Sequence, residues 1–108
     1  MKFKITGKKK TKRVFLIRAK TENPVYRLTA FLDLDTKEPL YPVNIESPLP
    51  GVTFTIDSET GASCSLPPII PGHMIHRFGE QLKQFDDVIT AARDWIRQEQ
   101  QKDDSSES

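Results

Sequence analysis

The clearest pattern in the chain is a run of apolar residues between Pro71 and Lys102 that recurs at steps of three and four. Such steps place all members on one face of an α-helix, and no strand periodicity fits them. We therefore predict one long amphipathic helix over residues 72–100, about 43 Å long at about 1.5 Å per residue. A helix of this length either kinks near Gly79 or overhangs the domain. The stripe, which we expect to be core or dimer interface, consists of Ile75, Phe78, Leu82, Phe85, Ile89, Ala92, Trp95 and Ile96.

The first two thirds of the chain alternate in the way that half-buried β-strands do. Two strands join in a hairpin with a lysine-rich tip, a longer strand follows, and a second hairpin turns at residues 58–61. The segment Glu38–Gly51 carries four prolines, which cannot donate a backbone hydrogen bond, so we predict a long ordered loop or sheet edge there. The predicted strands are Lys2–Thr6, Arg13–Ala19, Val25–Leu34, Val52–Asp57 and Ala62–Leu66.

This order of elements predicts the α+β class. We expect an antiparallel sheet of about five strands, built from hairpins and a meander, and one long C-terminal amphipathic helix packed across one face. Residues 1–102 would form a single domain, with an acidic, disordered tail at residues 103–108. One helix covers one face only, so apolar positions on the other face favour a homodimer.

Charge is distributed unevenly along the chain, although the net charge is only +1. Residues 1–20 hold nine lysines and arginines and no acidic residue, whereas the remainder holds seven basic and 15 acidic residues. A local basic patch attracts polyanions whatever the total charge. A single cysteine, Cys64, excludes an internal disulfide, and no long apolar run predicts a membrane segment. We expect a cytoplasmic protein without membrane contact.

The basic N-terminal hairpin is the strongest functional indication. Cations that follow phosphates and aromatic rings that stack on bases are the parts needed to bind single-stranded nucleic acid. The alternatives are a solvated hairpin tip, whose aromatic residues all lie in the core, and a surface that binds an acidic protein. The predicted nucleic-acid-binding residues are Lys8, Lys9, Lys10, Lys12, Arg13, Phe15, Arg18, Tyr26 and Arg27.

Strands followed by one long helix and paired as a dimer resemble, in the order of elements, the single-strand-binding Whirly and purine-rich-element-binding families. The resemblance implies binding of single-stranded DNA or RNA on a sheet. The proline-rich Glu38–Gly51 segment departs from it. The second hypothesis is a protein-interaction module of the accessory, inhibitor or immunity type, which would bind through the proline-rich loop, the basic hairpin or a flank of the helix.

Candidate catalytic and metal-binding groups are few. His73, His76 and Glu80 lie close in sequence, but two histidines near a helix start are more often surface residues, with His76 and Glu80 paired at i, i+4. The stretch 33–36 resembles the nucleophile loop of haloacid-dehalogenase-type phosphatases over four residues, with its threonine one place early; turn chemistry explains it better. Cys64 alternates inward, which is typical of an inert thiol. We expect a protein without enzymatic activity, cofactor or metal.

Overall fold

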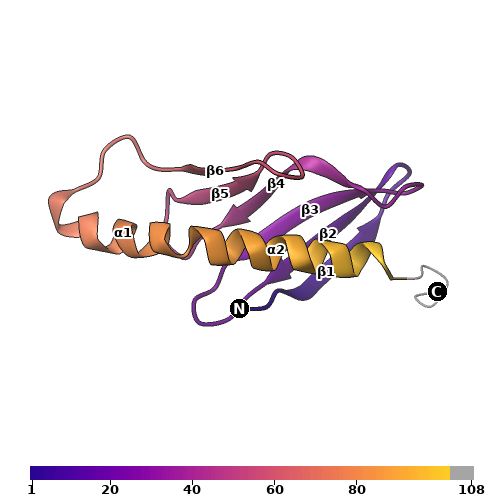
Figure 1. Cartoon of the computed structure of the whole chain (residues 1–108), viewed down its shortest axis with the longest axis horizontal. Helices are drawn as coiled ribbons and strands as arrows, with labels where there is room; N and C mark the ends of the chain where they lie inside the picture. The colour runs from indigo at the N-terminus through magenta and orange to yellow at the C-terminus, as the bar shows by residue number, and fades with distance from the viewer. Residues whose placement is uncertain (103–108) are drawn as a thin grey trace.

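The computed structural model describes residues 1–102, and within them a series of strands is followed by helices (Figure 1). The tail predicted at residues 103–108 lies outside the described residues. The elements are β1 (Lys4–Lys10), β2 (Val14–Lys20), β3 (Arg27–Asp33), β4 (Pro39–Glu46), β5 (Thr53–Ile56), β6 (Ala62–Ser65), the 3-10 turn η1 (Gly72–Met74), α1 (Ile75–Lys83) and α2 (Phe85–Gln100).

The six strands form one antiparallel sheet in which each strand pairs with its neighbour in sequence, from β1 to β6. This meander, followed by C-terminal helices, confirms the predicted α+β class. Short turns join the neighbouring strands of this meander. In the β1–β2 turn, the amide and the hydroxyl of Thr11 donate hydrogen bonds to the Val14 carbonyl, and the hydroxyl accepts one from the Val14 amide. In the β5–β6 turn, the Asp57 amide donates to the Gly61 carbonyl. The molecule is elongated, with extents of 52 × 23 × 22 Å.

The sheet has one strand more than the sequence predicted, because the proline-rich segment contributes β4. Its prolines occupy positions that need no ladder donor: Pro39 begins the strand, and Pro42 lies in an irregularity where the pairing jumps from Asn44 to Leu40. The prediction of a loop or edge over the whole segment was therefore wrong. Only its second part, residues 47–52, is a loop.

The first hairpin also differs from the prediction. Residues 8–10 were assigned to a turn, but β1 extends to Lys10 and the turn is limited to residues 11–13. A register shift between Ile5 and Gly7 lets the strand continue through the glycine. The three consecutive lysines therefore alternate between the two faces of the sheet.

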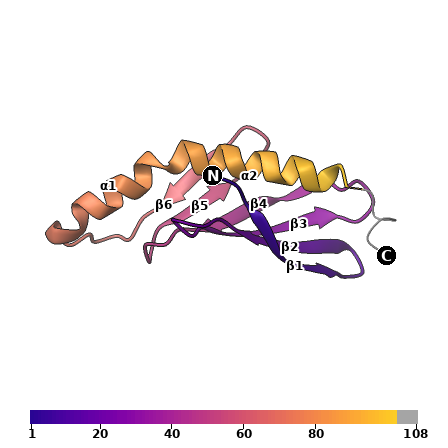
Figure 2. The same ribbon diagram turned by 90° about the horizontal axis from the view of Figure 1, so that it is seen from below.

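α2 packs across one face of the sheet, as Figure 2 shows from a second direction. Its buried side chains meet the inward residues of β2 to β5, among them Ile17, Leu28, Ile45 and Phe54. Phe54 makes an edge-on contact with Phe85 at 5.1 Å between ring centroids. Trp95 is covered from the other side by Phe3, at 6.5 Å. The C-terminal part of the predicted stripe is therefore core.

The predicted single helix is interrupted at Gln84, not at Gly79. α1 extends past the ends of the strands (Figures 1 and 2), so the overhang expected from the helix length is present. Phe78 is buried and Phe85 half-buried, but Ile75 and Leu82 are exposed. Of the two predicted alternatives, core or dimer interface, core is excluded for these two residues because the sheet does not reach beneath this part of the helix; the dimer interface stays a prediction.

Candidate nucleic-acid interface

Among residues 1–102, no other helix or strand covers the face of the sheet opposite α2 (Figure 2). Directly paired residues on neighbouring strands point to the same face, so the register shows which side chains meet there. One row across the strands is Lys9, Leu16, Phe31 and Leu40; the next is Arg18, Thr29 and Asn44; a third is Lys4, Lys20, Arg27 and Glu46. Cations, hydroxyl groups and one aromatic ring share this surface.

Two hollows on this open face carry more basic than acidic residues. The larger, about 280 Å³, lies between Arg18 and Arg27 and is bordered by Thr29, Asn44 and Glu46. The second, about 220 Å³, is lined by Lys2, Lys4, Lys20 and Glu22. Lysine and arginine outnumber glutamate in both. The arrangement therefore provides a positive track that two carboxylates interrupt but do not cancel.

Phe31 is the aromatic side chain that the open face presents. It is 41% exposed, between Leu16 on β2 and Leu40 on β4, and Leu40 is 42% exposed. An exposed ring that is held on both sides by aliphatic neighbours is pre-oriented for stacking on a planar group. The sequence prediction missed Phe31, although the alternation of Val25–Leu34 already placed it on the face opposite Leu28, Ala30 and Leu32.

The structure divides the seven basic residues of the predicted binding set among three places. Lys9, Arg18 and Arg27 lie on the open face, and Lys12 and Arg13 are exposed in the β1–β2 turn. Lys8 and Lys10 pair with Ile17 and Phe15, so they point to the helix side. Their ammonium groups lie 5.0 and 5.9 Å from the centre of the Phe15 ring.

The two aromatic residues of that set are not available for stacking. Phe15 is 7% exposed, and Tyr26 is fully buried, stacked 5.8 Å from Phe54. The Tyr26 hydroxyl donates to Oε1 of Gln81 at 2.8 Å and also contacts Gln84, and burial raises its pKa to about 12. Tyr26 therefore anchors α1 and the start of α2 to the sheet, and the exposed ring on the open face is that of Phe31.

The two weaker motifs of the sequence, residues 33–36 and the histidines near the start of α1, lie in a turn and on the surface. Oδ1 of Asp33 accepts hydrogen bonds from the amides of Asp35 (2.8 Å) and Thr36 (3.0 Å), which hold the pKa of this carboxyl below its usual value. His76 and Glu80 pair at 3.9 Å on the exposed side of α1. Within residues 1–102 no three potential ligands gather into a metal site, so His73, His76 and Glu80 do not form the cluster that was considered.

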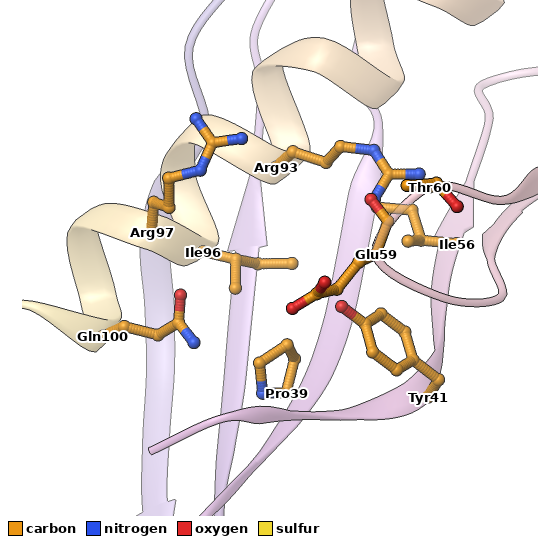
Figure 3. A pocket seen from close by; sticks show the side chains of 9 residues that line it. All are labelled: Pro39, Tyr41, Ile56, Glu59, Thr60, Arg93, Ile96, Arg97 and Gln100. Carbon is orange, nitrogen blue, oxygen red and sulfur yellow. The ribbon is translucent and has the colours of Figure 1, made fainter. Parts of the chain in front are cut away.

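A separate cleft of about 360 Å³ lies on the helix side, between α2, the start of β4 and the β5–β6 turn (Figure 3). Arg93 spans its wall: the guanidinium donates to the carbonyls of Ser58 (3.0 Å), Glu59 and Gly61 (3.2 Å). The Glu59 carboxylate points toward the Tyr41 hydroxyl (Figure 3), and burial, followed by this charge, raises the pKa of Tyr41. The cleft carries two arginines and one glutamate, the same charges as the larger hollow on the open face, but its Arg93 guanidinium is occupied by three backbone carbonyls.

No family model, curated protein or solved structure matches this chain. Across residues 1–102, neither helix combines the length and apolar character that crossing a lipid bilayer requires. The functional interpretation therefore depends on the chemistry of the surfaces alone.

Proposed function

We propose that this protein binds single-stranded nucleic acid on the open face of its sheet. The observation that supports the proposal is the coincidence, on one uncovered surface, of the hollow between Arg18 and Arg27 with the exposed ring of Phe31. Cations supply attraction to phosphates that does not depend on sequence, and an aromatic ring accepts any base. Binding with little base preference follows.

A flat six-stranded face suits a splayed single strand better than a duplex. Bases must be unstacked from one another before a side chain such as Phe31 can stack on them, and a duplex keeps its bases inside. The hydroxyl and amide groups of Thr29, Asn44 and Thr55, on the same face as Arg18, offer hydrogen bonds to sugars and phosphates. The β1–β2 turn, with Lys12 and Arg13, extends the positive track at one end.

The proposal includes a non-enzymatic role, a cytoplasmic location and a homodimer. Its alternative is a protein-interaction module in which the same basic surface binds an acidic protein. The two differ in their response to salt, because phosphate contacts release counterions and weaken steeply as salt rises, whereas interfaces centred on apolar anchors weaken less.

The test is fluorescence anisotropy of labelled single-stranded DNA, RNA and duplex DNA at several salt concentrations from about 50 to about 200 mM. The double variant Arg18→Ala/Arg27→Ala should lower the affinity for single strands and make the slope of log K against log salt shallower by about 1.4, at about 0.7 per phosphate contact. The matched control, Lys83→Ala/Arg97→Ala, removes the same charge from the helices and should leave the slope unchanged.

Two results would contradict the proposal. One is the absence of binding to any single strand at about 50 mM salt. The other is equal loss of affinity in the open-face variant and in the helix variant, because that would mean attraction by net charge without a defined surface. Preference for duplex DNA would overturn the stacking role of Phe31.

A further inference from the structure

The part of the molecule that projects beyond the sheet carries large apolar side chains in contact with solvent. Ile75 is 62% exposed and Leu82 42%, and Ile69, in the segment that leads into α1, is 81% exposed. Ile75 and Leu82 are seven residues apart and so lie on one face of α1. Figures 1 and 2 show the segment after β6 running outward from the sheet, along the length of α1, to the start of this helix. Clustered exposed apolar residues of this kind mark interaction sites.

Gly79 lies between these two residues on the same face of the helix. A Cβ atom built at this position would meet no atom within 4 Å, so nothing in the monomer requires a glycine. Glycine inside a helix costs stability relative to alanine, since it has more backbone freedom to lose. A glycine at this position has the benefit that the backbone of another helix can approach α1 closely. The face from Ile75 to Leu82 is therefore shaped to receive a second helix.

Charge along this part of the chain indicates which helix fits. The start carries Arg77 and two histidines, the middle Glu80 and Lys83, and the beginning of α2 the exposed pair Asp86 and Asp87. In an antiparallel pair centred on Gly79, Arg77 of each copy lies level with Glu80 of the other, and the start of each chain lies level with Asp86 and Asp87 of the other. A second copy placed parallel would bring residues of the same charge beside one another.

We propose that a second copy of this chain docks on α1 in antiparallel orientation, with Gly79 near the two-fold axis and Ile75 packed beside Leu82 of the second copy. Such an interface is isologous, so both copies bury the same apolar face and the assembly closes as a dimer. The open sheet face stays uncovered. The proposal does not rest on nucleic-acid binding and stands or falls separately.

The first test is sedimentation equilibrium of the full chain over a range of concentrations. The wild type should dimerise, and Ile75→Glu/Leu82→Glu should raise the dimer dissociation constant at least tenfold with unchanged circular dichroism. The matched control is Ile5→Glu, at a side chain that is 43% exposed on β1, which should dimerise like the wild type. A monomeric wild type, an open series of larger oligomers, or a dimer insensitive to the double variant would overturn the proposal.

A second test addresses the orientation. Gly79→Leu fills space that is empty in the monomer, so it should preserve the thermal midpoint while raising the dissociation constant at least tenfold. With Cys64→Ser as background, Gly79→Cys should form a disulfide between chains under mild oxidation. Lys83→Cys should not, because in the antiparallel pair its two copies lie about 12 Å apart along the axis. Equal cross-linking at both positions would overturn the antiparallel arrangement.

Discussion

At the scale of single residues, Tyr26 and Phe31 show how the alternation of side chains along an extended segment separates a structural residue from a proposed binding residue. They lie five positions apart, so their side chains point to opposite faces of the sheet. Tyr26 has no exposed surface and bonds to Gln81, whereas Phe31 is exposed beside basic residues. Residue type does not distinguish the two rings, because both are aromatic; Tyr26 directly precedes β3, and Phe31 lies within it.

Tyr26→Phe should lower the free energy of unfolding by about 1 kcal/mol at pH 8, because the amides of Gln81 and Gln84 lose a partner. Burial raises the pKa of Tyr26 from 10.0 to about 12, so the folded state favours the neutral phenol. The stability that this gives is complete below pH 10 and is lost as pH rises toward 12. At pH 11 the loss is about 1.4 kcal/mol.

Urea unfolding of the wild type and Tyr26→Phe at pH 8 and pH 11 would measure this effect. At pH 11 the difference between the two proteins should disappear or reverse slightly, because the loss of about 1.4 kcal/mol in the wild type is at least as large as the advantage of about 1 kcal/mol at pH 8. The lysines are the same in both proteins, so their effect on the free energy of unfolding cancels when the two proteins are compared. A difference that does not depend on pH would show that Tyr26 ionises equally in the folded and unfolded states.

Phe31→Ala should weaken binding of single-stranded DNA by about 1 to 3 kcal/mol, the contribution of one base stacked on an aromatic ring. Because the ring is 41% exposed, the variant should stay folded, with a thermal midpoint close to that of the wild type. Leu40→Ala removes a neighbour of equal exposure without a ring and should lose less. Phe31→Trp should retain binding; a loss as large as that of the alanine variant would exclude stacking.

At the scale of elements, the Arg93 guanidinium fastens the β5–β6 turn to α2. Its donors are directed at three carbonyls of that turn, and Ile96, one turn along the helix, is buried over Ile56 in the same cleft (Figure 3). The short strands β5 and β6, of four residues each, depend on such a tie because they have few ladder bonds of their own.

Arg93→Met should lower the free energy of unfolding by about 1 to 2 kcal/mol, because the aliphatic part is kept while charge-assisted hydrogen bonds to Ser58, Glu59 and Gly61 are lost. Arg97→Met is the control: that side chain is exposed and pairs only with Asp94 on the same helix among the residues described. It should change stability by less than about 0.5 kcal/mol. If chemical denaturation gave equal losses of unfolding free energy for the two variants, the hydrogen bonds of Arg93 to the β5–β6 turn would contribute nothing specific to stability.

At the scale of the whole molecule, burial is graded from the centre of the sheet to the projecting end. Leu28, Ala30 and Leu32 on β3 are covered on the helix side and paired on both edges, whereas α1 buries Phe78 as its one fully covered side chain. Segments with few buried apolar contacts open at lower free energy than the core. The same end of the molecule carries the proposed dimer face.

Amide hydrogen exchange should reproduce this gradient. In the monomeric Ile75→Glu/Leu82→Glu variant, amides of α1 should exchange at least tenfold faster than those of α2 and β3, a difference of about 1.4 kcal/mol in opening free energy. In the wild type at high concentration, α1 should gain protection if the dimer forms there. Uniform protection of α1, α2 and β3 in the variant would show a single cooperative unit.

The periodicities can be read from the residues alone, and they were enough to predict the α+β class, the two hairpins and the helical stripe. They depend on local geometry: period two for strands, and steps of three and four for helices. They also placed Phe31 on the face opposite Leu28. The alternation within β1 was hidden by the register shift at Gly7, so the lysines were assigned to a turn.

Which apolar positions are covered depends on the packing of the sheet against the helices. Ile75 and Ile89 occupy equivalent places in the stripe, yet one is exposed and the other buried, because the sheet extends beneath α2 and not beneath α1. Pairing on both sides made a strand of the proline-rich β4, and packing against Phe54 made Tyr26 a core residue. Burial results from contacts between segments distant in sequence, which local patterns do not contain.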